Sequence, residues 1–495
     1  MDYYFLTNPR MNISKLFDKT NTALQFKSAK IYSFLKVCLF HQYFKTISYI
    51  IISFGLTLKS QVIFIMRFFY IFLIVITCDT SYAQMYFQKL INSPFVVSSL
   101  SSTEAEGLYA PRDLDFNTDP SKPNELWVIN ENSATFDPNF GGSTVTYYNA
   151  GTDSQWAEYR KDSYSAHFMH TASAIAFSDN GGFANTLDVQ DANGNPNGYF
   201  SGCTLWEADT SIYARVNQNG PELGSHWDML HQSPFSVGIA AETENIYWLF
   251  DGYHNTIAKY NFQEPHPDHE HGGEDHSDGL IYRYDEVVVD RVEGLSSHMV
   301  IDQANGQLYI CDTGNQRILR MDINAGIINY NLTPYGENIE GYYSMTGAQY
   351  ETVIDSGLVS PTGIDIYENY LLVSDYSTGE IIIYNFEQPE NVHEIKRLQT
   401  GLVDDVMSIK SGPDGSIWYV CTNSGKLYQM LPPIDGDLNG DNNITLADII
   451  MLLSHITHSN LLDQEFHSLA DVDSNGDIDI FDLLLILDLI ESNSL

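Results

Sequence analysis

Between residues 108 and 432 the chain repeats one pattern of apolar and polar positions. Each copy has an apolar stretch of period two, a short polar gap, a second apolar stretch that usually ends in Asp, and a third apolar stretch. Such stretches, joined by Gly, Asn and Asp turns, predict short β-strands. The clearest copies are 297–323 and 360–386; others are 233–262, 109–132, 402–431 and a degenerate copy that begins at 170–177.

The copies start near residues 111, 170, 234, 297, 361 and 404, which defines six units of roughly 45–65 residues. Six such units predict a mainly β fold, a six-bladed β-propeller over residues 84–432. The segment LYICDTGNQRILRM resembles the NHL repeat, and the resemblance implies an NHL-type, TolB-like propeller. Because propellers of this kind include binding modules and enzymes, the fold alone does not indicate a function.

Two runs of alternating Asp and Asn near the C-terminus each lead into an apolar helical stretch, IIMLLSHI and LLLILDLI. A calcium loop supplies oxygen atoms at positions 1, 3, 5, 7, 9 and 12. These positions are filled by Asp437, Asn439, Asp441, Asn443, Thr445 and Asp448 in the first run, and by Asp471, Asp473, Asn475, Asp477, Asp479 and Asp482 in the second. We therefore expect two calcium ions in a small all-α module at 433–495. An acidic linker, the alternative, would not contain apolar helices.

The duplicated loop, with Asp at position twelve and no helix before the first loop, resembles a type I dockerin. The resemblance implies that the module docks onto a cohesin-bearing scaffold protein in an extracellular, often polysaccharide-degrading, assembly. Many dockerins carry a polar pair at loop positions ten and eleven. Here these positions hold Leu446-Ala447 and Ile480-Phe481, so the identity of the cohesin partner stays open.

Charge is distributed unevenly along the chain. Residues 1–83 carry nine Lys or Arg and three Asp or Glu, whereas the remaining residues carry 15 and 61. Such an acidic surface favours divalent cations and argues against nucleic-acid binding. Residues 66–83 have one positive charge, an apolar run and small residues ending in Ala83, the order of a secretory signal peptide. The run is too short for a stable membrane span, so we expect a secreted or extracellular mature protein.

Residues 1–65 leave two interpretations open. They are upstream sequence that is not native, with Met66 as the natural start, or the cytoplasmic tail of a membrane-anchored protein. In the exported part, Cys311 and Cys421 end corresponding strands, and we expect both thiols to be buried apolar groups rather than partners in a disulfide.

Several histidines precede first strands or follow second strands of the repeat, positions that share one face of a propeller. His298 opens a first strand, His254 follows a second strand, and His170 and His231 precede first strands. Three imidazoles around an open position can hold a catalytic zinc. The four residues are therefore a candidate metal site on the propeller rim, and ordinary loop histidines are the alternative.

The segments SSHM (296–299) and DGYHN (251–255) resemble zinc-binding and Tyr-bearing segments of peptidyl-α-hydroxyglycine amidating lyase, also a six-bladed NHL propeller. The resemblance implies a zinc-dependent lyase, although the equivalent positions of three other blades hold Arg112, Val237 and Thr362. A second histidine group lies in an acidic stretch that we expect as a surface insertion of blade three. Its members are His266, His269, His271 and His276. The stretch suits a zinc or copper site, an acidic calcium-binding loop or a solvated flexible loop.

Two functional hypotheses follow. In the first, a secreted calcium-binding protein binds a ligand or a protein through its propeller and is tethered to an extracellular scaffold through its C-terminal module. In the second, the propeller is a metal-dependent lyase or hydrolase with a histidine-ringed site on its rim. The sequence contains neither a GxSxG motif nor a phosphate-binding Gly loop, so it identifies no catalytic residue.

Overall fold

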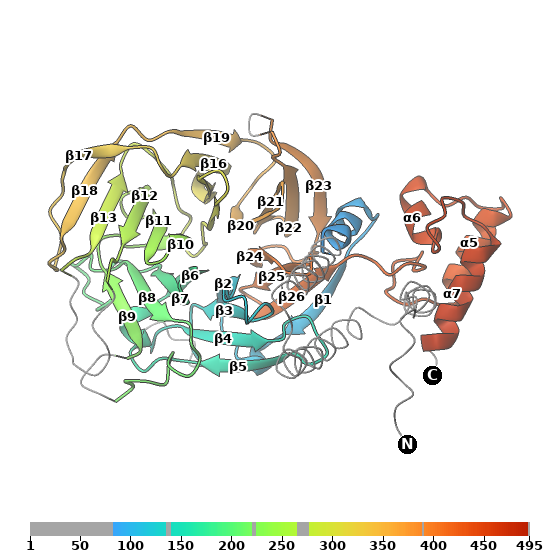
Figure 1. The fold of residues 1–495 in the computed structure, drawn as a ribbon, viewed down its shortest axis with the longest axis horizontal. Helices are drawn as coiled ribbons and strands as arrows, with labels where there is room; N and C mark the ends of the chain where they lie inside the picture. The colour runs from blue at the N-terminus through green and yellow to red at the C-terminus, as the bar shows by residue number, and fades with distance from the viewer. Residues whose placement is uncertain (1–82, 135–139, 220–223, 265–276, 389–390, 494–495) are drawn as a thin grey trace, which may run out of the picture. The chain divides into compact units, whose positions relative to one another are not determined.

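Six β-sheets surround one axis in the computed structural model, which describes residues 83–134, 140–219, 224–264, 277–388 and 391–493 (Figure 1). Three of the sheets consist of four consecutive antiparallel strands. Blade one is β2 (Pro111–Phe116), β3 (Leu126–Asn130), β4 (Ser143–Tyr148) and β5 (Trp156–Arg160). Blade two is β6 (Ala172–Phe177), β7 (Gly182–Leu187), β8 (Cys203–Glu207) and β9 (His226–Leu230). Blade five is β20 (Pro361–Tyr367), β21 (Tyr370–Asp375), β22 (Glu380–Asn385) and β23 (His393–Gln399).

The other three sheets include strands that are not consecutive in the chain. Blade three has β10 (Ser236–Thr243), β11 (Ile246–Asp251), β12 (Thr256–Asn261) and β13 (Leu280–Tyr284), followed by β18 (Gly341–Thr346) and β17 (Ile327–Asn331). Blade four is β14 (Met299–Asp302), β15 (Gln307–Asp312), β16 (Arg317–Asp322) and β19 (Tyr350–Ile354). Blade six is β24 (Val406–Ser411), β25 (Ile417–Cys421), β26 (Lys426–Leu431) and β1 (Val97–Ser102).

The innermost strands of neighbouring blades lie next to one another and close a ring of β2, β6, β10, β14, β20 and β24. Second strands such as LWVIN (β3) and IWYVC (β25) are buried along their whole length. Both of their faces pack against neighbouring blades, which is why they are continuous apolar runs rather than alternating ones. The outer strand β17, by contrast, is exposed throughout.

The innermost strands share an irregularity that positions the channel residues. In five of the six blades the pairing of this strand with the next one shifts near its first residues. Such a bulge bends a strand and re-aims its side chains. In β2 the shift lies between Pro111 and Asp113, so Arg112 is the extra residue.

The predicted six-bladed propeller is confirmed, and the blades begin close to the predicted positions. Two features were not predicted. The N-terminal strand β1 pairs with β26, so the two ends of the propeller chain meet in blade six. In addition, the 323–349 segment of blade four sends β17 and β18 to the sheet of blade three, where β18 pairs in parallel with β13.

Helices lie mainly outside the blades. Residues 83–92 form a helix whose side chains Phe87, Leu90 and Ile91 pack in a buried cluster with strands of blades five and six. Short helices in the loops are η1 (Glu104–Glu106), α4 (Ser165–Phe168) and η3 (Thr313–Asn315). The C-terminal module contains α5 (Leu446–Ile456), η4 (Gln464–Phe466), α6 (His467–Ala470) and α7 (Ile480–Asn493), as the two apolar stretches predicted. No helix in the described part of the chain is long and apolar enough to cross a membrane.

Candidate functional site

The two C-terminal loops fold around their first carboxylate in the same way. In the first loop, Asp437 accepts a hydrogen bond from the backbone N–H of Asn442, five residues later, at 2.8 Å. In the second loop, Asp471 accepts from the backbone N–H of Gly476, also five residues later, at 2.9 Å. Gly476 has φ +92°, a left-handed conformation that glycine adopts without strain, and it forms the sharp turn expected at this position.

The last carboxylate of each loop belongs to the first turn of the following helix. Asp448 accepts from the backbone N–H of Leu438 and of Thr445, both at 2.8 Å. Asp482 accepts from the backbone N–H of Asp479, again three residues earlier, at 2.8 Å. Both carboxylates are fully buried, so each one closes its loop and at the same time satisfies N–H groups at a helix start.

The loops bring acidic oxygens together without any basic partner among them. Ligand atoms of Asp471, Asp473 and Asp482 lie within 4.8 Å of one another. In the first loop, burial raises the pKa of Asp437 and the carboxylates of Asp448 and Asp441 raise it further, while backbone N–H groups lower it. Such a cluster fits Ca²⁺, a hard cation that binds carboxylate and carbonyl oxygens. A bound ion would offset part of the negative charge of its loop, and the six predicted ligand residues of each loop would hold one ion.

At the mouth of the propeller channel, alternating charges connect three blades. The guanidinium of Arg112, which is fully buried, donates to Glu131 at 2.5 Å and to the hydroxyl of Ser296 at 3.2 Å. On its other side it lies 3.7 Å from a carboxylate oxygen of Asp188, which also pairs with Arg291 at 2.8 Å. Burial raises the pKa of Asp188, and the two arginines oppose this effect.

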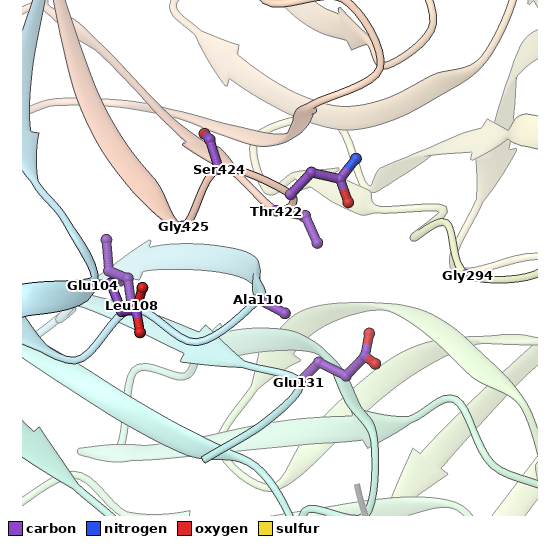
Figure 2. Close-up of a pocket in the computed structure, with 9 residues that line it drawn as sticks. Glu104, Leu108, Ala110, Glu131, Gly294, Thr422, Ser424 and Gly425 are labelled. Carbon is purple, nitrogen blue, oxygen red and sulfur yellow. The ribbon is translucent and has the colours of Figure 1, made fainter. Parts of the chain in front are cut away.

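Beside this network lies a polar cavity of about 330 Å³. It is formed by loops of blades one and six and by Gly294 of the loop between β13 and β14. Figure 2 shows Glu131 with its carboxylate directed into the space below Thr422 and Ser424. The lining also includes Glu104 and Asn423, so the cavity offers carboxylate, amide and hydroxyl groups, which suit a small polar ligand.

His298 and His254 have separate partners. His298 is buried in the channel, where its Nε2 lies 3.1 Å from the carbonyl oxygen of Arg112 and its Nδ1 lies 3.3 Å from Asp113. His254 instead contacts Asp251, with its Nδ1 2.8 Å from a carboxylate oxygen. The two imidazoles therefore have different acidic neighbours.

His170 and His231 also have partners of their own. The Nδ1 of His170 lies 3.2 Å from the carbonyl oxygen of Ala192. The Nδ1 of His231 lies 2.9 Å from Glu337, and its Nε2 lies 3.3 Å from the Nε2 of His167. Across the described ranges, the one group of three or more acidic, Cys or His ligand atoms that could hold a metal is that of Asp471, Asp473 and Asp482. The structure thus does not bring the four predicted histidines together as one metal centre.

The remaining predictions concern the second histidine group, the signal peptide and the cysteines. The second histidine group, His266, His269, His271 and His276, falls in the segment between β12 and β13 that the structure does not describe. Residues 66–82 of the predicted signal peptide also lie outside the described residues. Cys203, Cys311 and Cys421 are free and buried, as the strand positions of the last two predicted.

Sequence reasoning missed Arg112, Glu131, His167 and Glu337 as parts of polar clusters. The bulge that places Arg112 in the channel and the loop that carries Glu337 to His231 leave no periodic signal. Only the position of Arg112 at the start of a first strand indicated that this residue lies near the channel.

Comparison with protein families places the C-terminal module. Residues 435–490 match the model of the dockerin type I domain. This segment is a type I dockerin domain. The match covers both loops, all of α5 and most of α7, in agreement with the geometry described above. A search of curated proteins gave no match to the chain.

Solved structures to which the chain is similar share little of its sequence. An auxiliary nutrient binding protein from Bacteroides ovatus has a TM-score of 0.42 and 11% identity, covering 68% of this chain and 77% of its own. A luciferin-regenerating enzyme has a TM-score of 0.40 and 13% identity, covering 68% and 95%. Streptogramin B lyase has a TM-score of 0.37 and 13% identity, covering 68% and 97%. The assignment of six blades rests on the strand pairing, not on these similarities.

Proposed function

We propose that this protein is an exported, calcium-binding modular protein whose dockerin domain tethers its propeller to a cohesin-bearing extracellular scaffold. The observation that supports this function is the pair of calcium loops, each closed by a buried Asp at position twelve, within a matched type I dockerin domain. Calcium orders the loops, and the ordered loops start the two helices that carry the docking surface. The predicted signal peptide supports export, and a polysaccharide-degrading assembly is the setting in which such tethering is useful.

The two dockerin helices carry matching exposed apolar residues, which favour an apolar docking surface. In α5 these are Leu446, Ile450 and Leu453, and in α7 they are Ile480, Leu484 and Leu487. Their side chains are between 37% and 66% exposed. Residues with this spacing lie on one side of a helix, and each residue of the first set has its counterpart 34 positions later.

An exposed apolar stripe on a soluble domain usually marks an interaction site. Leu446 and Ile480 occupy loop position ten, where the dockerin resemblance places residues that select the partner. We infer that the cohesin partner presents an apolar contact face, and that the departure from a polar pair reflects partner specificity rather than loss of docking.

The propeller supplies the ligand-binding part of the proposal. The cavity beside Arg112 is lined by carboxylate, amide and hydroxyl groups, which can form hydrogen bonds with a small hydroxylated ligand. The metal-dependent lyase or hydrolase is not favoured by a specific observation, because the four rim histidines have separate partners.

The tethering proposal is tested by binding the full chain to an immobilised panel of purified type I cohesin modules with and without calcium. We expect calcium-dependent binding to at least one module. The double variant Leu446→Ser/Ile480→Ser should bind at least about 10-fold more weakly, because an apolar side chain of this size contributes about 1.5–3 kcal/mol when buried.

The matched control is Leu461→Ser, which changes an exposed leucine between the helices and should not alter binding. Far-UV circular dichroism and calcium titration establish that each variant retains its helices and its ions. A chain that binds calcium but none of the cohesin modules would contradict the proposed tethering. Equal binding by the double variant would contradict the apolar docking surface alone.

A further inference from the structure

His167 and His231 form a close pair of imidazoles that belongs neither to the dockerin domain nor to the channel mouth. Their Nε2 atoms lie 3.3 Å apart. His167 is in α4, between blades one and two, and His231 follows β9. A third segment, the loop between β17 and β18, brings the carboxylate of Glu337 to the opposite nitrogen of His231 at 2.9 Å.

We propose that His167 and His231 bind one divalent transition-metal ion through their Nε2 atoms, with Glu337 as the residue that orients His231. Imidazole nitrogen suits zinc and copper among the first-row metals. This site is independent of the proposed tethering, because none of its residues belongs to the dockerin domain.

The distance between the two nitrogens supports a shared ion. Zinc binds histidine nitrogen at about 2.0–2.1 Å with tetrahedral angles, which places two ligand nitrogens about 3.3–3.4 Å apart. The observed 3.3 Å matches this separation, and a hydrogen bond between the two rings is the alternative that the zinc titration tests.

Glu337 orients the imidazole ring of His231. Its carboxylate accepts from the backbone N–H of His231 at 2.8 Å, from the side chain of Gln232 at 2.7 Å and from the Nδ1 of His231 at 2.9 Å. A carboxylate only accepts hydrogen bonds, so the Nδ1 of His231 donates to Glu337 and its Nε2 faces His167. Metal-binding histidines commonly have such a carboxylate on the second nitrogen.

Aromatic rings hold both imidazoles in place. Phe200 stacks on His231 with ring centres 3.6 Å apart, and Phe168 meets His167 edge to face at 4.8 Å. The site is therefore largely preformed. His231 is buried and His167 is partly exposed, and water would have to supply the remaining ligands of a bound ion.

The test titrates Zn²⁺ into the full chain, expressed without a His tag and saturated with calcium so that the dockerin loops are occupied. The background variant carries His→Asn at His266, His269, His271 and His276, which removes the other histidine group. We expect about one zinc per chain by isothermal titration and elemental mass spectrometry. His167→Asn should abolish this binding, and Glu337→Gln should weaken it by about 10- to 100-fold.

His393→Asn, at an exposed position in blade five, is the matched control and should leave zinc binding unchanged. Thermal unfolding checks that each variant is folded, and the visible spectrum of the Co²⁺ form reports on nitrogen ligation without any activity assay. If the background variant holds no zinc, or if a folded His167→Asn variant binds zinc as tightly as the background variant, the pair is a hydrogen-bonded structural contact and the proposal is wrong.

Discussion

Asp448 and Leu438 are joined by a 2.8 Å hydrogen bond in which the last carboxylate of the first calcium loop accepts from the backbone N–H of its second residue. The same side chain accepts from Thr445, the residue that caps α5, so that the two side chains form a capping box. The loop and the helix therefore share one carboxylate. Because Asp482 has the corresponding place at the start of α7, the two halves of the dockerin domain are built alike.

The first prediction concerns this shared carboxylate. Asp482→Ala should lower the number of calcium ions bound per chain from two to one, because it removes the buried oxygens at position twelve of the second loop. The variant should also lose helix content, since Asp482 lies in the first turn of α7 and accepts from the backbone N–H of Asp479, the residue before the helix, as in a capping box. Isothermal titration with calcium and far-UV circular dichroism measure the two effects.

Asp488→Ala is the control for this change. Asp488 lies on the same helix but is exposed and outside the loop, so calcium binding should stay at two ions. If Asp482→Ala retained two ions of equal affinity, the assignment of position twelve would be wrong.

The second prediction concerns the helix that follows the expected signal-peptide cleavage site. Phe87 is fully buried and packs on Tyr367 and Tyr370 of blade five, with ring centres 4.4 Å and 5.3 Å away. Phe87→Ala should lower the free energy of unfolding of the propeller by about 3–5 kcal/mol, the usual cost of removing a buried aromatic side chain. Chemical denaturation followed by tryptophan fluorescence measures the loss.

Met85 supplies the comparison, because it lies on the same helix and is largely exposed. Met85→Ala should change stability by less than about 0.5 kcal/mol. Equal losses in the two variants would mean that Phe87 does not pack on the propeller as described.

The third prediction concerns the charged network at the channel mouth. Arg112→Met should destabilise the propeller by about 3–5 kcal/mol, because it leaves the carboxylates of Glu131 and Asp188 without their shared buried partner. Arg112→Lys should recover only part of this loss, since an ammonium group lacks the planar fork that contacts Glu131 and Ser296 together. Unfolding free energies of the three proteins provide the measurement.

Arg397→Met is the matched surface substitution. Arg397 pairs with Glu380 and Glu394 on blade five but remains partly exposed, so its loss should cost about 1 kcal/mol or less. If both Arg→Met changes had the same small effect, the network at the channel mouth would not be a buried one.

The blades and the dockerin helices could be predicted because their signals are local and periodic. Strands such as β15 (QLYICD) and β21 (YLLVSD) repeat the same apolar run before Asp, and the calcium loops repeat the same spacing of oxygens. Each of these patterns reports the environment of consecutive residues, which a sequence displays directly.

The contacts of the histidines could not be predicted in this way. A position at the start or end of a strand indicates the face of the propeller, but the partner of a side chain depends on loops of irregular length. The insertion that contains β17 and β18 brings Glu337 to His231, over a separation of 106 residues. A strand bulge at Arg112 places the carbonyl oxygen of this residue against the Nε2 of His298. Neither an insertion nor a bulge leaves a periodic pattern in the sequence. The sequence therefore could not show that the four rim histidines have separate partners.

The fourth prediction follows from the burial of His298. Burial lowers the pKa of this histidine, although Asp113 partly offsets the effect. As the pH falls below about 6.5, the unfolded chain therefore takes up a proton at this position before the folded chain does, and the free energy of unfolding decreases.

His298→Gln, which keeps an N–H group near the carbonyl of Arg112, should lose less stability between pH 7.5 and 5.5 than the unaltered protein, by up to about 1.4 kcal/mol per pH unit below 6.5. His393→Gln, at an exposed position, should retain the full dependence. Identical pH profiles for the His298 variant and the unaltered protein would show that this buried imidazole does not contribute to the acid sensitivity of the propeller.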